Sequence, residues 1–444
     1  MSQDAPSNEA SSVRIAGVPT ETFSGERRVA LVPSNVATLK KAGIGVIIQS
    51  GAGAQAGYDD DEYAAAGAEL NSDRNVLFER ADIILQVRAA GANPDTGNED
   101  RSRLRDGQTL IGMCDPLVGA RAMQELAGRG VTSFALELLP RITRAQSMDV
   151  LSSQASIAGY KAVLAAAAQL PKMCPMMMTA AGTIAPARFF VLGAGVAGLQ
   201  AIATAKRLGA VVWSYDVRPA VKEEVLSLGA KFLEIDLVKS EDKQSGDYAR
   251  EMDEEFYRRQ REAMMKVIRE SDVIITTAAI PGRKAPVLVT EEMVQAMPTG
   301  SIIIDLAAES GGNCALTRAR EIVVAHGVTI DGTINLPATV PYHSSQMYGR
   351  NVTTFLLHLL KEGALDSATG DEIVRGTLVT HGGEVVNDRV RTALGLTPAE
   401  NKSGEAASSD PAVSDTTAAD NSATTEAVER NDAAETAGPI NSDS

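Results

Sequence analysis

The sequence is poor in cysteine, in aromatic residues and in long apolar runs, and each shortage excludes a class of protein. Its 444 residues include three cysteines and one tryptophan, and aromatic residues make up 4% of the chain. Cys114, Cys174 and Cys314 lie far apart and form no CxxC or Cys/His cluster, so we expect no metal site and no disulfide framework. This use of cysteine favours a reducing, cytoplasmic setting.

Two further absences concern membranes and nucleic acids. No apolar run reaches the roughly 18 uncharged residues of a membrane-spanning helix, and the N-terminus lacks the charged and apolar regions of a signal peptide. We therefore expect that the chain itself does not cross a membrane. Its formal net charge of -15 argues against nucleic acid as a partner, because phosphates are bound by clustered Lys and Arg.

The two ends of the chain differ in composition from the rest. We expect residues 1–12 to be a flexible leader. Residues 397–444 contain ten acidic and two basic residues and almost no large apolar side chain. This composition predicts a disordered acidic tail, with a solubilising role favoured over a docking role.

Between these ends, short apolar runs alternate with helical patterns. In the N-terminal portion, strands are predicted at residues 13–18, 45–49, 81–87 and 108–113, and a helix at 33–42. After an Ala-rich helical segment at 156–170, strands are predicted at 189–192, 211–215, 231–235, 273–276 and 301–304, with a charge-rich helix at 246–270. This alternation predicts α/β units built on parallel sheets.

A glycine motif marks the second unit as a nucleotide-binding domain. The strand at 189–192 runs into Gly193-Ala-Gly195-Val-Ala-Gly198 and a helix, and Asp216 ends the next strand. The motif alone is weak, but with a strand before it, a helix after it and an acidic residue about twenty positions on, the combination is strong. Gly193 permits the turn, Gly195 lets the backbone approach a pyrophosphate and Gly198 allows close helix packing.

Asp216 selects the expected ligand. Its carboxylate would accept hydrogen bonds from ribose hydroxyls and repel a 2'-phosphate, which predicts NAD(H) rather than NADP(H). We include the turn residues Val196 and Ala197, and Val217 and Arg218 after the acid, among the cofactor-binding candidates. The alternative is that the glycines serve only a turn and Asp216 only caps a strand end.

These patterns predict two Rossmann-like, doubly wound parallel-sheet domains with the nucleotide in the cleft between them. The first domain is expected to comprise residues 13–150 and about 328–395, because 328–336 and the helical 345–360 are expected to return and pack on it. The second domain is expected to comprise residues 151–327.

A polar cluster lies just before the connecting helix. It contains Arg141, Gln146, Asp149 and Ser152 in an otherwise apolar neighbourhood. Its composition alone says little, and Asp149 or Ser152 could simply cap the helix that follows.

Four runs of sequence together resemble the NAD(H)-binding component of the proton-translocating transhydrogenases, a family related to alanine dehydrogenase. They are RAQSMDVLSSQ at 144–154, MMMTAAGT at 176–183, GAGVAGLQAIATAKRLGA at 193–210 and DLAAESGGNC at 305–314. The resemblance extends over about residues 13–360. It implies that the segment 141–152 reaches over the nicotinamide, that Gln146 contacts the ribose or ring region, and that Arg141 and Asp149 hold the segment and the nicotinamide.

Two more sites follow from the family pattern and the strand order. The resemblance implies a mobile loop that closes over the nucleotide, with its tip at 246–249 and Tyr248 as the candidate lid residue, although Tyr248 could be an ordinary surface tyrosine. Thr277 and Ala278 follow a predicted strand and would lie beside the cofactor at the carboxyl edge of the sheet. A purely structural turn is the alternative there.

The resemblance also implies an activity and partners. Hydride would pass between NADH on this chain and NADP+ held by a separate NADP(H)-binding subunit, coupled to proton translocation by membrane-spanning segments of partner subunits. Hydride transfer between two nicotinamides requires the positioning of rings rather than a general acid. The resemblance implies a homodimer and a cytoplasmic location, attached to the inner face of the cell membrane through the partners.

Two other functions stay open. Alanine dehydrogenase shares the pattern at residues 26–31, but it uses a His and a Lys of the first domain. All four histidines, at positions 326, 343, 358 and 381, fall in the C-terminal portion, so none is expected in the first domain, and Arg88 stands at the Lys position. Arg28 could bind a carboxylate or form a structural ion pair. The third possibility is a non-catalytic NAD(H)-binding module.

Overall fold

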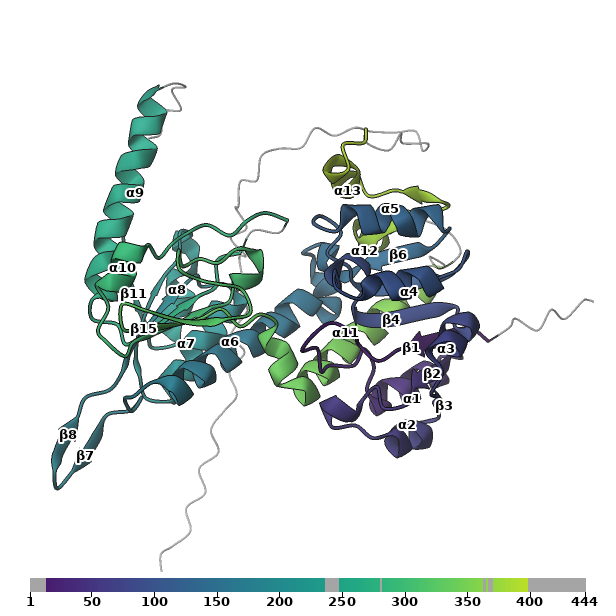
Figure 1. Ribbon diagram of the computed structural model, residues 1–444, viewed down its shortest axis with the longest axis horizontal. Helices are drawn as coiled ribbons and strands as arrows, with labels where there is room; N and C mark the ends of the chain where they lie inside the picture. Colours follow the sequence, from purple (N-terminus) through teal and green to yellow (C-terminus); the bar gives the residue numbers. More distant parts are fainter. Residues whose placement is uncertain (1–12, 236–246, 280–281, 362–364, 366–369, 398–444) are drawn as a thin grey trace, which may run out of the picture. The chain divides into compact units, whose positions relative to one another are not determined.

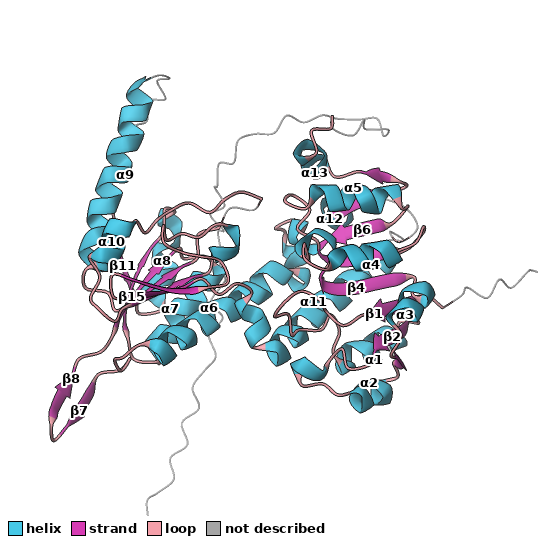
Figure 2. Ribbon diagram, viewed as in Figure 1, coloured by secondary structure: helices cyan, strands magenta, loops and turns pink. Residues whose placement is uncertain are grey.

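The described residues form two large sheets, each flanked by helices, and a third sheet of two strands (Figures 1 and 2). The computed structural model describes residues 13–235, 247–279, 282–361, 365 and 370–397, with only the backbone for 247–257. The predicted leader and all but the first residue of the predicted tail lie outside the described residues. Within the described residues, no helix combines the length and apolar character that a membrane crossing requires.

The first sheet has eight strands in the order β17-β16-β6-β5-β4-β1-β2-β3. Its strands are β1 Ile15–Val18, β2 Gly45–Gln49, β3 Glu69–Asn71, β4 Ile83–Arg88, β5 Thr109–Met113, β6 Thr132–Ala135, β16 Leu378–His381 and β17 Glu384–Val385. β1 to β6 pair in parallel, and β16 and β17 add an antiparallel edge. The order 3-2-1-4-5-6 of the parallel strands is that of a doubly wound sheet, which places a topological switch point between β1 and β4.

Short helices connect these strands, and local capping determines where they begin and end. They are α1 Pro33–Lys41, α2 Asp60–Ala66, α3 Arg74–Arg80, α4 Gly97–Arg103 and α5 Ala120–Gly128. In α2, the Asp59 side chain accepts a hydrogen bond from the Glu62 N–H, and Gly67 ends the helix in the left-handed region at φ 96°. A capped start and a glycine stop of this kind determine where this two-turn helix begins and ends.

The second sheet repeats the same strand order. It runs β11-β10-β9-β12-β13-β15-β14, with only β14 antiparallel to its neighbour. Its strands are β9 Arg188–Leu192, β10 Val211–Tyr215, β11 Lys231–Phe232, β12 Val273–Thr276, β13 Ile302–Asp305, β14 Ile322–Ala325 and β15 Val328–Asp331. Its helices are α7 Val196–Arg207, α8 Lys222–Ser227, α9 Asp247–Ile268 and α10 Glu291–Gln295. The predicted fold class of two doubly wound α/β sheets is confirmed.

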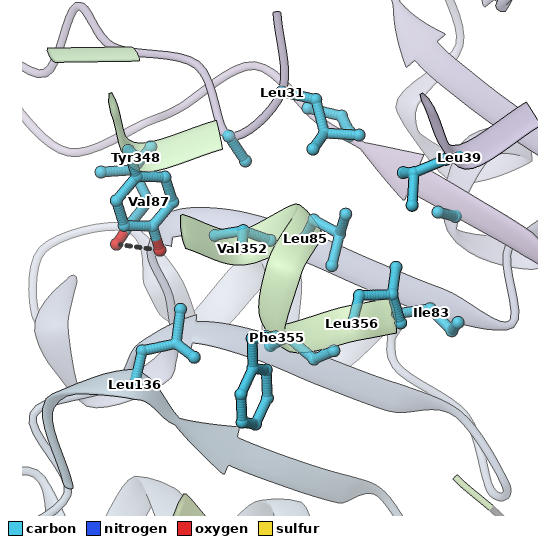
Figure 3. Close-up of a cluster of buried hydrophobic side chains, with 14 of the residues drawn as sticks. Leu31, Leu39, Ile83, Leu85, Val87, Leu136, Tyr348, Val352, Phe355 and Leu356 are labelled. Atoms are coloured by element: carbon cyan, nitrogen blue, oxygen red, sulfur yellow. Dashed lines mark hydrogen bonds between the residues drawn. The ribbon is translucent and has the colours of Figure 1, made fainter. Parts of the chain in front are cut away.

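The chain passes between the sheets on two long helices, α6 Val150–Gln169 and α11 Pro341–Lys361. α11 lays one apolar face on the first sheet, where Tyr348, Val352, Phe355 and Leu356 meet the β4 side chains Ile83, Leu85 and Val87 (Figure 3). The spacing of 3 and 4 residues along α11 places these side chains on a single stripe. The Tyr348 hydroxyl donates a hydrogen bond to the Gln86 carbonyl at 2.7 Å.

Two expectations about the C-terminal portion are wrong. Val328–Asp331 does not return to the first sheet, because β15 pairs in parallel with β13 of the second sheet. The return occurs later, through α11. The expectation that no histidine lies in the first domain is wrong as well, because His381 at the end of β16 and His358 on α11 belong to the first sheet and its core helix, within the range 328–395 that was itself assigned to that domain. A histidine's place along the chain therefore does not tell which sheet it joins.

A buried ion pair lies near the start of α6 and just ahead of α11, the two helices on which the chain passes between the sheets. Arg28, in the loop after β1, bonds with its Nη2 to the Glu26 carboxylate at 2.6 Å, and both side chains are almost fully buried. Arg28 also donates to Gln154 of α6 and to Asn335, which precedes α11, both at 2.8 Å. Burial alone would raise the pKa of Glu26, but the charge and hydrogen bonds of Arg28 outweigh it and the pKa is lowered. Arg28 thus forms the structural ion pair considered above, and its guanidinium donates to Glu26, Gln154 and Asn335.

Arg28→Ala tests how strongly the fold depends on this pair. The substitution leaves the Glu26 carboxylate buried without its counter-charge, which typically costs about 3–5 kcal/mol of unfolding free energy. Urea unfolding of the variant should show this loss, while Arg27→Ala, at the neighbouring exposed arginine, should leave stability within about 0.5 kcal/mol. Equal midpoints for the two variants would contradict the assigned role.

Candidate functional site

The glycine turn between β9 and α7 requires glycine at two of its positions for steric reasons. Gly193 has φ 98°, and a Cβ there would lie 2.4 Å from the Thr277 hydroxyl. A Cβ on Gly198 would lie 1.8 Å from the Gly193 carbonyl oxygen. These close approaches bring the start of α7 directly onto the strand turn. The sequence-based roles of Gly193 and Gly198 agree with this geometry.

The third glycine borders open space. A Cβ on Gly195 would meet no atom within 4 Å. Gly195 is the N-cap of α7 and offers no side-chain cap, so the first N–H groups of this 12-residue helix lack a side-chain acceptor there. A helix N-terminus with free N–H groups and room in front of it suits a phosphate group. The residues present therefore fit the pyrophosphate of a dinucleotide.

Asp216 lies beside this turn, immediately after β10. Its Oδ2 accepts a hydrogen bond from the Ala194 N–H at 2.7 Å, and Oδ1 accepts from the Arg218 N–H at 2.8 Å. Burial tends to raise the pKa of Asp216, but the hydrogen bonds from Arg218 and Ala194 dominate and lower it. The carboxylate is therefore ionised at neutral pH, and its two oxygens also accept from Nε and Nη2 of Arg218, each at 3.1 Å. Val217 and Arg218 are exposed next to it.

Thr277 and Ala278 complete the carboxyl edge of the sheet. The Thr277 hydroxyl donates to the Gly193 carbonyl at 3.1 Å, so the residue after β12 holds the glycine turn by a hydrogen bond. Ala278 is partly buried, and its N–H donates to Asn313. The structure thus brings the glycine turn, Asp216, Thr277 and Ala278 together at the switch point between β9 and β12, where open α/β sheets bind ligands.

The polar segment before α6 has a clear local role. The Asp149 side chain caps α6, accepting hydrogen bonds from the Ser152 N–H at 3.0 Å and the Ser152 hydroxyl at 2.5 Å. Arg141 and Gln146 are exposed. Within the described residues, no hydrogen bond joins either of these two side chains to the glycine turn. Their contact with a cofactor stays a prediction, while the capping alternative for Asp149 agrees with the structure.

Tyr248 cannot be placed as a lid residue. Its backbone lies in the first turn of α9, and its side chain and the preceding residues 236–246 lie outside the described residues. Its proposed role stays a prediction.

Two polar contacts at this edge escaped the sequence analysis. Asn313 is fully buried and bonds to both backbone polar groups of Ala278. Arg88, at the end of β4, donates to the Glu309 carboxylate at 2.6 Å and lies over the Phe23 ring. Asn313 and Glu309 both belong to the run 305–314, which the sequence analysis used only as a resemblance. Its position directly after a strand was the signal that could have revealed them.

Comparison with known families decides where the chain belongs. Residues 17–158 match the family model "Alanine dehydrogenase/PNT, N-terminal domain", and residues 162–388 match "Alanine dehydrogenase/PNT, C-terminal domain". The chain belongs to the alanine dehydrogenase/PNT family. The two matches together span most of the described chain, so the resemblance found in the sequence is confirmed.

Individual relatives separate the two branches of the family. A Rhodospirillum rubrum protein, named as the first part of NAD(P) transhydrogenase subunit alpha, is 46% identical over 374 residues, covering 83% of this chain and 97% of that protein. The crystal structure of transhydrogenase from Sinorhizobium meliloti superposes with a TM-score of 0.75 at 43% identity, over 84% of this chain and all of that one. Alanine dehydrogenase of Halomonas elongata is 30% identical, covering 85% of this chain and 96% of that protein. This member of the family thus resembles the transhydrogenase subunit more than this alanine dehydrogenase.

Asp216→Ala tests the nucleotide site. It removes a charged acceptor, so NADH binding should weaken by on the order of 1.5–3 kcal/mol. The variant should also discriminate less against NADPH, because Arg218 loses its carboxylate partner and is free for a 2'-phosphate. Titration with both nucleotides measures the two effects.

The matched control for this prediction is Glu79→Ala, which removes an exposed acid on α3 of the other sheet. It should leave both affinities unchanged. Unchanged NADH affinity in Asp216→Ala would refute the assignment of the glycine motif.

Proposed function

We propose that this chain is the NAD(H)-binding component of a proton-translocating NAD(P) transhydrogenase. The observation that carries the proposal is the ionised Asp216, held by hydrogen bonds beside a glycine turn that opens onto the N-terminus of α7. Bound NADH would supply a hydride, which passes to NADP+ on a partner subunit. The similarity to a transhydrogenase subunit over 97% of its length supports the choice of reaction.

The residues of this chain bind and orient rather than transfer protons. The N–H groups of Gly195, Val196 and Ala197 hold the pyrophosphate, and Asp216 holds the adenosine ribose, flanked by Val217 and Arg218. Thr277 and Ala278 border the dinucleotide where it crosses the edge of the sheet. Such fixed groups accelerate a transfer by positioning, since two rings must meet at a defined distance.

The nicotinamide end is assigned to the segment before α6. Arg141, Gln146, Asp149 and Ser152 hold the ring, and Tyr248 closes over it. Asp149 is suited to a double role, because its cap on α6 fixes the segment that carries Gln146. These assignments rest on the matching residues of the family pattern.

Proton translocation and NADP(H) binding fall to partner subunits. The names of two relatives, each given as the first portion of a subunit alpha, denote one component of a larger assembly. The partners are membrane-spanning and NADP(H)-binding subunits, and this chain lies in the cytoplasm at the inner face of the cell membrane, attached through them. Hydride transfer and proton movement are coupled across that contact.

A transhydrogenation assay tests the function. The purified chain is mixed with NADH, an oxidised NAD analogue of distinct absorbance, and an NADP(H)-loaded partner from a known transhydrogenase. The analogue should be reduced only when the partner is present. Activity with pyruvate and ammonia instead would show an alanine dehydrogenase, and silence in both assays despite NADH binding would show a non-catalytic module.

Gln146→Ala sharpens this assay. Because a misplaced ring costs rate through geometry, transfer should slow by roughly ten- to a hundredfold while NADH affinity changes much less. Ser147→Ala, at the next exposed position of the same segment, is the matched control and should behave as the wild type. Unchanged transfer in Gln146→Ala would leave the segment with its capping role alone.

The chain is also proposed to form a homodimer. The hairpin β7 Met177–Thr179 and β8 Gly182–Ile184 is exposed along both strands and extends away from the second sheet (Figures 1 and 2). Met176 is 60% and Met178 76% exposed, an apolar surface that a second copy would cover.

Sedimentation velocity tests the homodimer. Met178→Asp should shift the wild-type dimer towards monomer, because a charge at the centre of an apolar contact must be desolvated. Val324→Asp, at a similarly exposed apolar residue on the edge strand β14, should sediment as the wild type. A wild-type monomer at all concentrations would contradict the proposal.

A further inference from the structure

Asn313 is a buried amide whose hydrogen-bonding groups are all directed at two backbone segments. Its side chain is fully buried. Its Oδ1 accepts from the Ala278 N–H at 3.0 Å, and its Nδ2 donates to the Ala278 and Pro286 carbonyls, each at 2.8 Å. The amide therefore pairs with Ala278 much as a neighbouring strand would.

Ala278 needs such a partner because it has left the sheet. β12 ends at Thr276, and the pairing with β13 ends with it. Beyond that point, the N–H and carbonyl of Ala278 lose the ladder that orders the strand. An unpaired backbone group at a partly buried position would cost free energy or draw the segment into other conformations.

Asp305 holds Asn313 itself in place. The fully buried Asp305 carboxylate accepts hydrogen bonds from the Asn313 N–H at 2.7 Å and the Cys314 N–H at 3.0 Å. It also accepts from the hydroxyls of Thr276 at 2.9 Å and Thr317 at 2.6 Å. The end of β12 and the segment that carries Asn313 are thereby fixed to the same carboxylate.

The chain of contacts ends under the glycine turn. Ala278 follows Thr277, whose N–H donates to the Leu192 carbonyl and whose hydroxyl donates to Gly193. Moving Ala278 would move Thr277, whose hydroxyl lies 2.4 Å from the position that a Cβ on Gly193 would take. Asn313 thus acts on the nucleotide site through two residues that lie at its edge.

We infer that Asn313 is a positioning residue for NAD(H): its side-chain amide orders Ala278 and Thr277 before the dinucleotide arrives. The inference rests on the proposed NAD(H) site. A segment ordered in advance spares the ordering cost at binding, so loss of the amide appears as weaker binding by the folded protein. A merely structural asparagine would lower stability and leave the affinity of the folded protein unchanged.

Asn313→Asp and Asn313→Ala separate these two roles by their pH profiles. NADH binding is followed between pH 6 and 9 through the emission of Trp213, the single tryptophan, which overlaps the absorption of NADH. Asn313→Ala should weaken binding by about tenfold at every pH, because all three hydrogen bonds of the Asn313 amide are lost at once. Asn313→Asp should be as weak at pH 9, where a carboxylate faces two carbonyl oxygens, and should recover severalfold towards pH 6 as the carboxyl is protonated and donates again.

The neighbouring titratable groups are the same in every variant. Asp305 and Cys314 lie against Asn313, and Asp216 lies across the turn, so the wild-type profile measured in parallel accounts for them. Urea unfolding confirms that each variant is folded under the binding conditions. Affinity within twofold of the wild type in folded Asn313→Ala, or identical pH profiles for the two variants, would overturn the inference.

A milder variant keeps the test decisive if substitution of Asn313 prevents folding. Thr317→Val removes one hydrogen bond to Asp305 with little change of shape, and it should weaken NADH binding about two- to fivefold. No change in its affinity would overturn the inference. A wild-type chain that fails to bind NADH would instead overturn the proposed function, so the two failures are distinguishable.

Discussion

The buried pair of Arg28 and Glu26 is the constraint on which the arrangement of the chain depends. One guanidinium reaches the loop after β1, the first turns of α6 and Asn335 in the segment between β15 and α11. These are the segments on which the chain leaves the first sheet and returns to it. A buried charge pair is weak evidence for stability in general, because desolvation offsets attraction. Here its value lies in specificity, since four hydrogen bonds from the Arg28 guanidinium join these three segments.

The second sheet also fixes its loops with carboxylates at strand ends. Asp216 follows β10 and Asp305 ends β13, with β9 and β12 between them, and each accepts hydrogen bonds from backbone N–H groups of a loop that has left the sheet. Asp216 also pairs with the Arg218 guanidinium, whereas Asp305 accepts from neutral N–H and hydroxyl groups. The Asp216 side chain is 7% exposed beside the exposed Val217 and Arg218, whereas Asp305 is fully enclosed and fixes the loops.

The sequence predicted those features of this molecule that local chemistry determines. The apolar runs predicted β2 and β12 to the residue, and the glycine motif predicted a tight turn after β9, because the steric demands at Gly193 and Gly198 are local. Where pairing is between distant segments, prediction failed. Nothing in Val328–Asp331 itself distinguishes the two sheets, since its register with β13 depends on residues 27 positions earlier. The amide of Asn313 was missed for the same reason, because its partner Ala278 lies 35 residues away.

The two sheets share a strand order, but the residues at their switch points differ. In the second sheet, the Ala194 N–H after β9 bonds to the charged Asp216; at the matching place in the first sheet, the Thr20 N–H after β1 bonds to the neutral Gln49 at 2.9 Å.

At the carboxyl end of β1, the chain itself fills the region beside β4. The Glu21 carboxyl accepts hydrogen bonds from the N–H groups of Val87 and Arg88 at the end of β4. Burial, reinforced by Glu26, raises the pKa of Glu21 to about 8, so the group is largely protonated at neutral pH. No helix starts at this turn, because α1 begins only at Pro33. Within the described residues, this turn of the first sheet therefore has neither the helix N-terminus nor the ionised acceptor that suit the second sheet to a dinucleotide. The same fold thus has one switch point that suits a nucleotide and one that the chain itself fills.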